Sequence, residues 1–313
     1  MNITDVNLFF ACDDSYVPFL AVTLASIKQH RSKERCYNIK ILTTGIKKEN
    51  EERLLSSLAD FNFNIEVADI SDSVNTISEK LHTRDYYSKT TYYRLFIPEL
   101  YKDIDKALYL DCDLVLCTDV AELYDTELKD NLVGAVADGF VSSVSRLHDY
   151  VTERVGVHKP CDYFNAGVLL MNLKEMRNAS FGEKFIELIG KITFNVAQDQ
   201  DYLNVLCNGR RAVISDEWNC MPGFCKKSKP AKLIHFNLDS KPWHKDGIEF
   251  SEVFWKYADM SCFAKEIREI HDSYSENEKS EGETRNLIDV AEEQGRDEEE
   301  NRRIREQLAS IWM

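Results

Sequence analysis

Short apolar blocks separated by polar turns run along the first part of the chain, and their spacing alternates between that of a strand and that of a helix. Val6–Cys12 is a compact apolar run that ends at the polar cluster Asp13-Asp14-Ser15, which predicts a strand and then a turn. The blocks that follow predict a helix from Pro18 to about His30, a strand at Tyr37–Thr43, a helix at Lys47–Ala59 and a strand at Phe63–Ala68. Strands that alternate with helices in this way indicate βαβ units and an α/β fold with a mostly parallel sheet.

The alternation continues through the middle of the chain. The patterns predict a helix at Ser88–Phe96, a strand at Ala107–Leu116, a short helix near Val120–Tyr124, strands at Leu132–Ala137 and Tyr163–Asn172, helices at Lys174–Lys191 and Asp199–Cys207, and a last strand at Lys232–His235 that closes the sheet.

The composition changes at about Tyr274. Ser275–Arg305 is dense in charged residues, and Ile304, Leu308, Ile311 and Trp312 then form a weak apolar stripe at helical spacing. We therefore expect a globular domain at 1–273 and an acidic tail at 274–313. The tail is interpreted as a solvated helix or a partly disordered segment, and a docking element for a partner or for the protein's own body stays open.

Composition narrows the function classes. The 313 residues carry a formal net charge of −15, which argues against nucleic acid as a partner but not against a phosphate ligand bridged by a divalent cation. No apolar run is long enough for a transmembrane segment, and the start of the chain lacks the features of a signal peptide. Nine scattered cysteines without a C-x-x-C motif are typical of free thiols in a reducing cytoplasm. We expect a cytoplasmic protein, with association at the inner face of the membrane and oligomeric state left open.

Two carboxylates interrupt the apolar strand Ala107–Leu116. Asp111 and Asp113 are spaced i, i+2, which in an extended chain puts both side chains on one face. Two carboxylates about 5 Å apart repel by roughly 3 kcal/mol at an effective dielectric of about 20. A half-buried pair therefore favours a bound cation or a shared proton. An accidental, exposed pair is the alternative on this pattern alone, because the motif is short and common.

Other polar residues follow the predicted strands in the same way. Asp13 follows the first strand, Asp138 follows Leu132–Ala137, and His235 ends the last strand. Ligands of open α/β sheets bind outside the carboxyl ends of strands. The placement of all these residues at strand ends predicts a ligand site there.

Six segments, taken in order, resemble the motifs of glycosyltransferase family 8, which includes bacterial lipooligosaccharide galactosyl- and glucosyltransferases and glycogenin. They are Phe10-Ala11-Cys12-Asp13-Asp14-Ser15-Tyr16, Thr91-Tyr92-Tyr93-Arg94-Leu95, Tyr109-Leu110-Asp111-Cys112-Asp113, Phe164-Asn165-Ala166-Gly167-Val168, Gln198-Asp199-Gln200-Asp201, and His235 followed by Lys241-Pro242-Trp243. The resemblance runs from about residue 6 to 245. It implies a GT-A fold, that is, a mixed and mostly parallel nucleotide-binding sheet flanked by helices, and a retaining transferase that uses a UDP-sugar.

The resemblance also implies roles for single residues. Asp111, Asp113 and His235 are expected to bind Mn²⁺, with Mg²⁺ as the alternative ion, and two carboxylates, an imidazole and phosphate oxygens form an octahedral site that suits Mn²⁺. Lys241 is expected at the diphosphate. The other residues expected to bind the donor are Ala11, Asp13, Tyr16, Arg94, Asp111, Asp138, Asn165 and Ala166.

Gln200 and Asp199 are the expected catalytic residues. Retention usually involves a carboxylate nucleophile, but the residue that the motif places nearest the anomeric carbon is Gln200, whose amide oxygen is a poor nucleophile. We therefore expect attack on the same face from which UDP departs, with a covalent role for Asp199 as the alternative. The expected reaction moves glucose or galactose from a UDP-hexose to a saccharide or glycoconjugate acceptor.

Several features keep alternatives open. The family motif usually has glycine where this chain has Leu238, which suggests a reshaped loop. A catalytically degenerate UDP-sugar-binding or scaffold protein is therefore the alternative function. A nucleotidyltransferase also uses paired aspartates, but Phe9–Tyr16 lacks the glycine-rich, basic phosphate loop that such an enzyme needs. Ordinary structural roles stay open for single residues: packing for Tyr16, an ion pair for Arg94, a turn cap for Asp138, and a strand bulge at Asn165-Ala166-Gly167.

Overall fold

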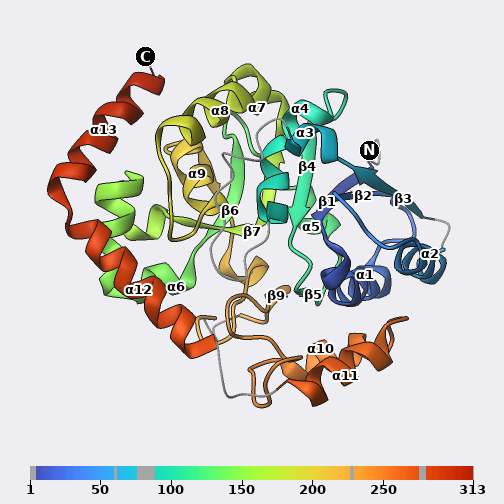
Figure 1. The fold of residues 1–313 in the computed structure, drawn as a ribbon. Coiled ribbons are helices and arrows are strands. Elements are labelled where there is room, and N and C mark those ends of the chain that lie inside the picture. The colour runs from blue at the N-terminus through green and yellow to red at the C-terminus, as the bar shows by residue number, and fades with distance from the viewer. Residues whose placement is uncertain (1–4, 60–61, 76–88, 226–228, 275–279, 313) are drawn as a thin grey trace. The chain divides into compact units, whose positions relative to one another are not determined.

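The computed structural model describes residues 5–59, 62–75, 89–225, 229–274 and 280–312. The chain forms two compact units, each assembled from three segments. Figure 1 labels the helices and strands along the chain. Unit 1 contains residues 1–71, 107–127 and 215–279, and unit 2 contains residues 72–106, 128–214 and 280–313. The sequence analysis instead divides the chain at residue 273, into a globular domain and a tail. This domain boundary stays a prediction.

The sheet of unit 1 has the strand order β3-β2-β1-β4, and its strand pairs are parallel. Its strands are β1 (Val6–Ala11), β2 (Tyr37–Thr43), β3 (Phe63–Asp69) and β4 (Lys106–Leu110). The connecting helices are α1 (Val17–His30) and α2 (Lys48–Ser57), and the unit also contains α5 (Ala121–Tyr124), α10 (Ser251–Ala258) and α11 (Ala264–Ser273). The apolar runs pack as the sequence pattern predicts: Leu8, Phe10 and Ile39 are fully buried.

The acidic run Ala107–Leu116 is not one strand, and this part of the prediction is wrong. The chain leaves the sheet after β4, turns through Asp111-Cys112-Asp113, and resumes as β5 (Leu114–Leu116). Thr23 of α1 explains the break, because its hydroxyl lies 2.9 Å from the Cys112 carbonyl and 2.8 Å from the Leu114 carbonyl. A helix hydroxyl thus serves backbone groups that the interrupted strand leaves without ladder partners.

The last predicted strand also has a different partner from the one expected. β9 (Leu233–His235) pairs antiparallel with β5 in a separate two-stranded sheet, in which Leu114 lies opposite His235. The segment Lys232–His235 therefore does not close the main sheet. The pairing instead brings His235 next to the acidic turn, which precedes β5.

Unit 2 is built around β7 (Phe164–Asn172), β6 (Val133–Ala137) and β8 (Arg211–Val213), a short strand that the sequence analysis missed. β6 pairs antiparallel with β7 and parallel with β8. The helical elements of unit 2 include α3 (Ser71–Asn75), the 3₁₀ helix η3 (Lys89–Phe96), α4 (Ile97–Leu100), α6 (Gly139–Ser143), α7 (Leu173–Asn178), α8 (Phe181–Lys191) and α9 (Asp199–Leu206). Helix α3 begins at the boundary between the two units. The single helix expected at Lys174–Lys191 is two, because Ser180 between α7 and α8 has a left-handed backbone with φ 54°.

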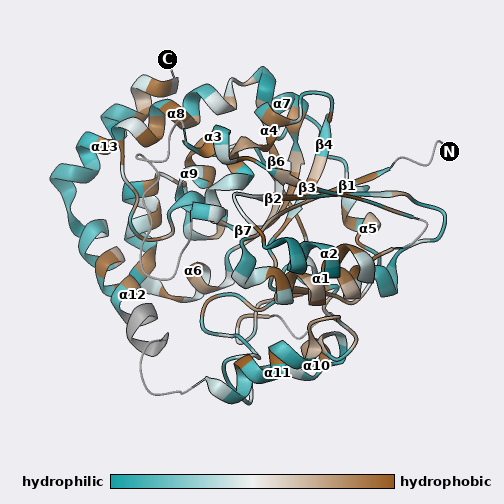
Figure 2. Ribbon diagram, turned by 45° about the vertical axis from the view of Figure 1, so that its right-hand side comes forward, coloured by the Kyte–Doolittle hydropathy of each residue, from teal (hydrophilic) through white to brown (hydrophobic). Residues whose placement is uncertain are grey.

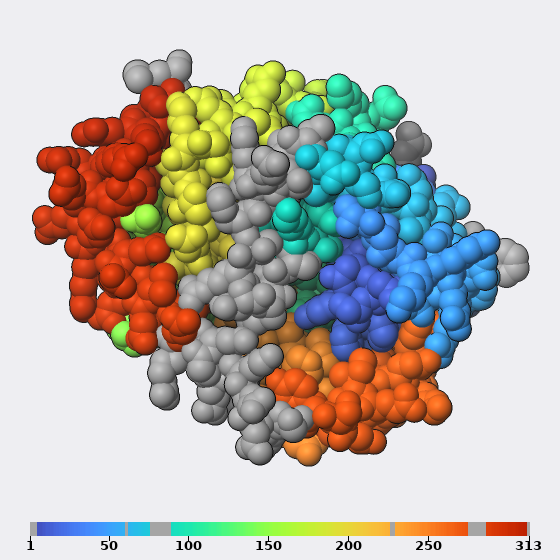
Figure 3. Space-filling view, viewed as in Figure 1, coloured from blue at the N-terminus to red at the C-terminus, as the bar shows by residue number. Residues whose placement is uncertain are grey.

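The charged tail forms two helices, α12 (Ser280–Arg296) and α13 (Glu298–Trp312), which lie against other elements of unit 2 (Figure 3). Figure 2 shows α13 as mostly hydrophilic with a few hydrophobic positions, and Ile304, Leu308 and Ile311 of the predicted stripe are buried. Gly295 allows a close approach, since a Cβ there would lie 2.6 Å from the backbone nitrogen of Tyr150. The sequence analysis left open whether the tail is a solvated or partly disordered segment or a docking element. For residues 286–311 the structure shows helices that contact the protein's own body.

The predicted fold class is confirmed: parallel strand pairs predominate, one pair in unit 2 is antiparallel, and helices flank the strands. Within the described ranges, none of the helices combines the length and the apolar character that crossing a bilayer requires.

Candidate active site

In unit 1, β4, β5 and β9 bring together Asp111, Asp113, His235 and Lys241, which we call the acidic cluster. One ligand atom from each of Asp111, Asp113 and His235 lies within 4.8 Å of the other two. His235 Nε2 is 3.3 Å from Asp113 Oδ1 and 3.8 Å from Asp111 Oδ2. The three residues expected as metal ligands are therefore gathered at one point, although His235 is more than 100 positions from the two aspartates in the sequence.

The hydrogen bonds around His235 orient it as a ligand. Its Nδ1 lies 3.0 Å from Oδ1 of the buried Asn219. With that oxygen as acceptor, Nδ1 carries the proton and Nε2 presents a lone pair to the two carboxylates. Sequence reasoning missed Asn219, because an isolated asparagine between Trp218 and Cys220 gives no signal before β9 is placed beside it.

The buried carboxylate of Asp113 carries the strongest electrostatic signal in the acidic cluster. Burial by itself would raise the pKa of Asp113, but the Lys241 ammonium and the His235 imidazole hold that pKa below its ordinary range. Asp113 forms an ion pair with Lys241 through Oδ2, while its buried Oδ1 has no hydrogen-bond partner among the described residues. An ionised carboxylate oxygen, a second carboxylate and an imidazole lone pair facing one another fit a divalent cation.

The start of the chain lies beside this cluster. Ala11 ends β1, and its carbonyl accepts a hydrogen bond from the Cys112 thiol of the acidic turn at 3.2 Å. Tyr16 packs edge-on against Phe19, whose ring stacks on Trp243 at a centroid distance of 4.0 Å. These rings connect two of the sequence motifs within unit 1.

Asp13 has a structural role in this region. Its Oδ1 accepts hydrogen bonds from Ser15 N at 3.0 Å, Ser15 Oγ at 2.6 Å and Tyr16 N at 3.2 Å, which caps the 3₁₀ helix η1 (Asp14–Tyr16). The cap fixes the turn directly after β1.

One cysteine pair near His235 differs from the sequence expectation. Cys220 and Cys225 form a disulfide with a Cα–Cα distance of 4.9 Å, so the expectation of free thiols is wrong for this pair. The carbonyl of Cys220 accepts a hydrogen bond from the backbone nitrogen of His235 at 2.9 Å. The disulfide therefore closes a loop whose first residue supports the strand that carries His235.

In unit 2, a second group of predicted site residues lies in η3, at the carboxyl end of β6, in the first part of β7 and at the start of α9. We call this group the amide cluster; it consists of Arg94, Asp138, Asn165, Ala166, Asp199 and Gln200. All of these except the partly exposed Gln200 are buried. The structure thus gathers four of the expected donor-binding residues with the two expected catalytic residues.

Asp138 holds the two amides of this cluster. Its Oδ2 accepts hydrogen bonds from Asn165 Nδ2 at 3.1 Å and from Gln200 Nε2 at 3.2 Å. Its Oδ1 caps α6 by accepting from Val141 N at 2.9 Å. The turn-cap interpretation and the site interpretation of Asp138 are therefore both compatible with the geometry.

The bulge in β7 exposes backbone groups to Gln200. Ala135 pairs with Leu169 but Ala137 pairs with Phe164, so the register shifts across Asn165-Ala166-Gly167. Gln200 Oε1 accepts a hydrogen bond from the freed Ala166 N at 2.9 Å. Bulges of this kind often aim side chains at a functional site.

Arg94 and Asp199 form an ion pair with Nε and Oδ2 3.1 Å apart, and their side chains are only 5% and 7% exposed. Arg94 also donates to the Ala166 carbonyl at 2.5 Å. The residue before Asp199, Gln198, is strained: it has φ 48°, and both polar atoms of its buried amide have no hydrogen-bond partner among the described residues. Sequence reasoning assigned no role to Gln198, whose strain appears only in the folded backbone.

The loop between β9 and Lys241 contains Leu238, the position at which the sequence analysis suggested a reshaped loop. Leu238, at the position where the related motif has glycine, adopts φ 48° in the left-handed region. The loop thus keeps a backbone conformation that suits glycine, and the leucine bears the strain.

Comparison with known proteins agrees with this geometry. The fold and the site define a glycosyltransferase of GT-A fold. Residues 7–247 match the family model described as glycosyl transferase family 8, and the chain belongs to that family.

Two relatives illustrate the match. A Haemophilus influenzae protein with a provisional glycosyltransferase name is 30% identical over 251 residues, which cover 77% of this chain and 73% of the relative. The lipopolysaccharide 1,2-glucosyltransferase of Escherichia coli is 31% identical over 190 residues, covering 55% of this chain and 54% of the relative.

Solved structures extend the likeness to three dimensions. The galactosyltransferase LgtC, solved with donor and acceptor sugar analogues, matches with a TM-score of 0.65 and 26% identity over 90% of this chain and 100% of LgtC. The bifunctional glycosyltransferase WbbM matches with a TM-score of 0.72 and 28% identity over 87% of this chain. This chain spans about half of WbbM, since the match covers 52% of that protein.

Proposed function

We propose that this glycosyltransferase moves a hexose, glucose or galactose, from a UDP-sugar to a saccharide or glycoconjugate acceptor, with retention of anomeric configuration. The observation that carries the proposal is the acidic cluster, in which Asp111, Asp113 and His235 present three ligand atoms to one point. The names of the glucosyl- and galactosyltransferases to which the chain is similar support a hexose donor.

In this proposal, Asp111, Asp113 and His235 hold Mn²⁺, with Mg²⁺ as the alternative ion. The bound ion supplies Lewis acidity that stabilises negative charge on the departing diphosphate. Lys241, paired with Asp113 in the structure, contacts the diphosphate and adds a positive charge. Ala11, Asp13 and Tyr16 hold the nucleoside.

The amide cluster orients the sugar of the donor in the same proposal. Asn165 and Gln200 offer amide groups, and Asp138 offers a carboxylate, for the vicinal hydroxyls of the hexose. Arg94 keeps Asp199 ion-paired, and this weakens the carboxylate as a nucleophile. The pairing supports attack on the face from which UDP leaves, beside Gln200, over a covalent intermediate on Asp199.

The test combines turnover with direct metal binding. Hydrolysis of UDP-glucose, UDP-galactose, UDP-N-acetylglucosamine and UDP-glucuronate is measured with and without Mn²⁺, and Mn²⁺ binding is followed by electron paramagnetic resonance. Asp113→Asn is expected to weaken Mn²⁺ binding and to reduce metal-dependent hydrolysis by about 100-fold or more, because it removes a charged ligand. Asp125→Asn is the matched control: Asp125 is a carboxylate on the same chain segment, more than half exposed and paired with Arg35.

Three outcomes decide between the proposals. Loss of Mn²⁺ binding and hydrolysis in Asp113→Asn alone supports the assignment. Unchanged Mn²⁺ binding in that variant contradicts it. If the protein binds a UDP-sugar tightly but neither hydrolyses any donor nor transfers its sugar to any acceptor, the degenerate binding protein is favoured instead.

A further inference from the structure

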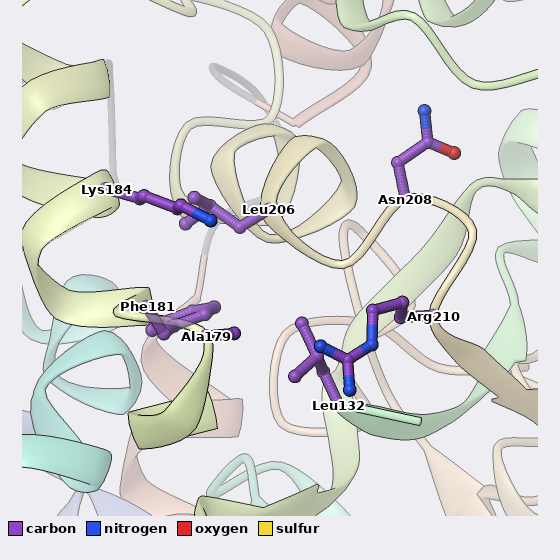
Figure 4. A pocket seen from close by; sticks show the side chains of 7 residues that line it. All are labelled: Leu132, Ala179, Phe181, Lys184, Leu206, Asn208 and Arg210. Carbon is purple, nitrogen blue, oxygen red and sulfur yellow. The ribbon is translucent and has the colours of Figure 1, made fainter. Parts of the chain in front are cut away.

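A cavity of about 450 Å³ lies within unit 2, and no residue of either cluster lines it (Figure 4). Its volume is within the range of small-molecule binding sites in proteins. It is lined by residues from the start of β6, the α7–α8 junction, α8, and the chain from the end of α9 to β8: Leu132, Ala179, Phe181, Lys184, Leu206, Asn208 and Arg210.

The lining divides into an apolar part and a cationic part. Leu132, Phe181 and Leu206 supply hydrocarbon surface, while Lys184 and Arg210 approach from opposite sides in Figure 4. No carboxylate belongs to the lining, although the chain as a whole carries a net charge of −15. A concave apolar surface flanked by two cations is complementary to a ligand with a hydrocarbon body and one anionic group.

The contacts of Arg210 hold its guanidinium at this cavity. Nε donates to the Asp130 carbonyl at 3.1 Å, and Nη2 lies 3.3 Å from a Glu175 carboxylate oxygen. Nη1 has no partner among the residues that the structure describes. The guanidinium is therefore oriented by two neighbours and retains a donor group for a ligand anion.

The cavity is separate from the amide cluster. Leu132 directly precedes β6 and Asp138 directly follows it, so the five residues of the strand separate the two by roughly 20 Å. Helix α9 likewise has Asp199 and Gln200 in its first turn and Leu206 at its end. The cavity is thus a second site and not an extension of the proposed sugar site.

We propose that this cavity binds an amphiphilic anion whose hydrocarbon body contacts Leu132, Phe181 and Leu206 and whose carboxylate or phosphate head group pairs with Lys184 and Arg210. The proposal does not depend on the donor or acceptor of the transfer reaction, because no residue of either cluster lines the cavity.

Isothermal titration of the full chain with decanoate, decyl phosphate and decanol, all below their aggregation concentrations, tests the proposal. At least one anion is expected to bind about tenfold or more tightly than decanol, because only the anions gain charge-assisted hydrogen bonds. The ranking of decanoate and decyl phosphate distinguishes a carboxylate ligand from a phosphate ligand. Equal binding of all three compounds, or no binding at millimolar concentration, overturns the proposal.

Two variants locate the binding. Lys184→Gln is expected to weaken anion binding about fivefold, because it removes one partly exposed charge pair. Lys174 is an exposed lysine on α7 that does not line the cavity, and Lys174→Gln is expected to leave anion binding unchanged. Ala179→Leu adds side-chain volume to the cavity and is expected to reduce binding of the anion by tenfold or more without lowering the thermal midpoint. Anion binding that survives Ala179→Leu, or that falls equally in the two lysine variants, contradicts the proposed location.

Discussion

Replacing Leu238 by glycine is predicted to stabilise the protein relative to alanine at the same position. Leu238 is the second residue of a turn closed by Ser240 N donating to the Asn237 carbonyl at 3.1 Å, and its φ is 48°. Turns with positive φ at this position favour glycine. A left-handed backbone costs a residue with a Cβ about 1–2 kcal/mol, while glycine loses about 0.4–1 kcal/mol through greater freedom of the unfolded chain. Leu238→Gly should therefore be about 0.5–1 kcal/mol more stable than Leu238→Ala.

The comparison of glycine with alanine removes the loss of the leucine side chain from the result, since both variants lack it. Leu55 in the interior of α2 is a matched control, because it is also partly buried but helical. There glycine should be about 1 kcal/mol less stable than alanine. The free energies of unfolding are measured by urea denaturation with equal m-values required. If glycine is less stable than alanine at both positions, Leu238 does not hold the strained conformation and the reasoning fails.

Three further predictions follow from the site and from the packing of the tail. Gln200→Ala should lower kcat by about 100-fold while changing UDP affinity little, and equal losses in kcat and UDP affinity would contradict its placement beside the sugar. Burial raises the pKa of Asp201 to about 6, so its contribution to stability is complete below the unfolded pKa and is lost as pH rises through about 6. The stability of the wild type relative to Asp201→Asn should then fall by about 1.4 kcal/mol between about pH 5 and about pH 8, and a flat or rising difference in urea unfolding would refute this sign. Gly295→Ala should destabilise the protein by about 1–3 kcal/mol, because the added methyl meets the backbone of Tyr150. Gly182→Ala in α8 meets only a flexible side chain and should cost less or stabilise, and similar thermal shifts for both variants would show that the tail does not pack as closely as observed.

The local pattern predicted the alternating elements of unit 1 well. β2 has the expected bounds of Tyr37–Thr43, and β1 and α1 end within one residue of the expected positions. These elements are long, periodic and bounded by capping or turn residues, so the information that forms them lies within each segment. β8 was missed because three residues with an exposed valine carry no period.

The sequence also indicated which residue types gather at the site. Motifs that are far apart in the chain named the acidic pair, the distant histidine and the residues of the amide cluster, and the structure collects them into two groups. It could not show Asn219 behind His235, the pairing of Arg94 with Asp199, or the strain at Gln198. Each of these depends on contacts between segments that no local pattern encodes.

The sequence by itself determined the fold class, the order of most elements and the chemistry available at the strand ends, because periodicity, turn residues and motif spacing act over a few positions. Only the tertiary structure decided that the acidic run breaks into two strands, that β9 pairs with β5, and that the tail helices pack against unit 2. The reason is physical. Thr23 reaches the carbonyl groups of an interrupted strand, and Gly295 admits a neighbouring backbone, only after segments distant in sequence have come together.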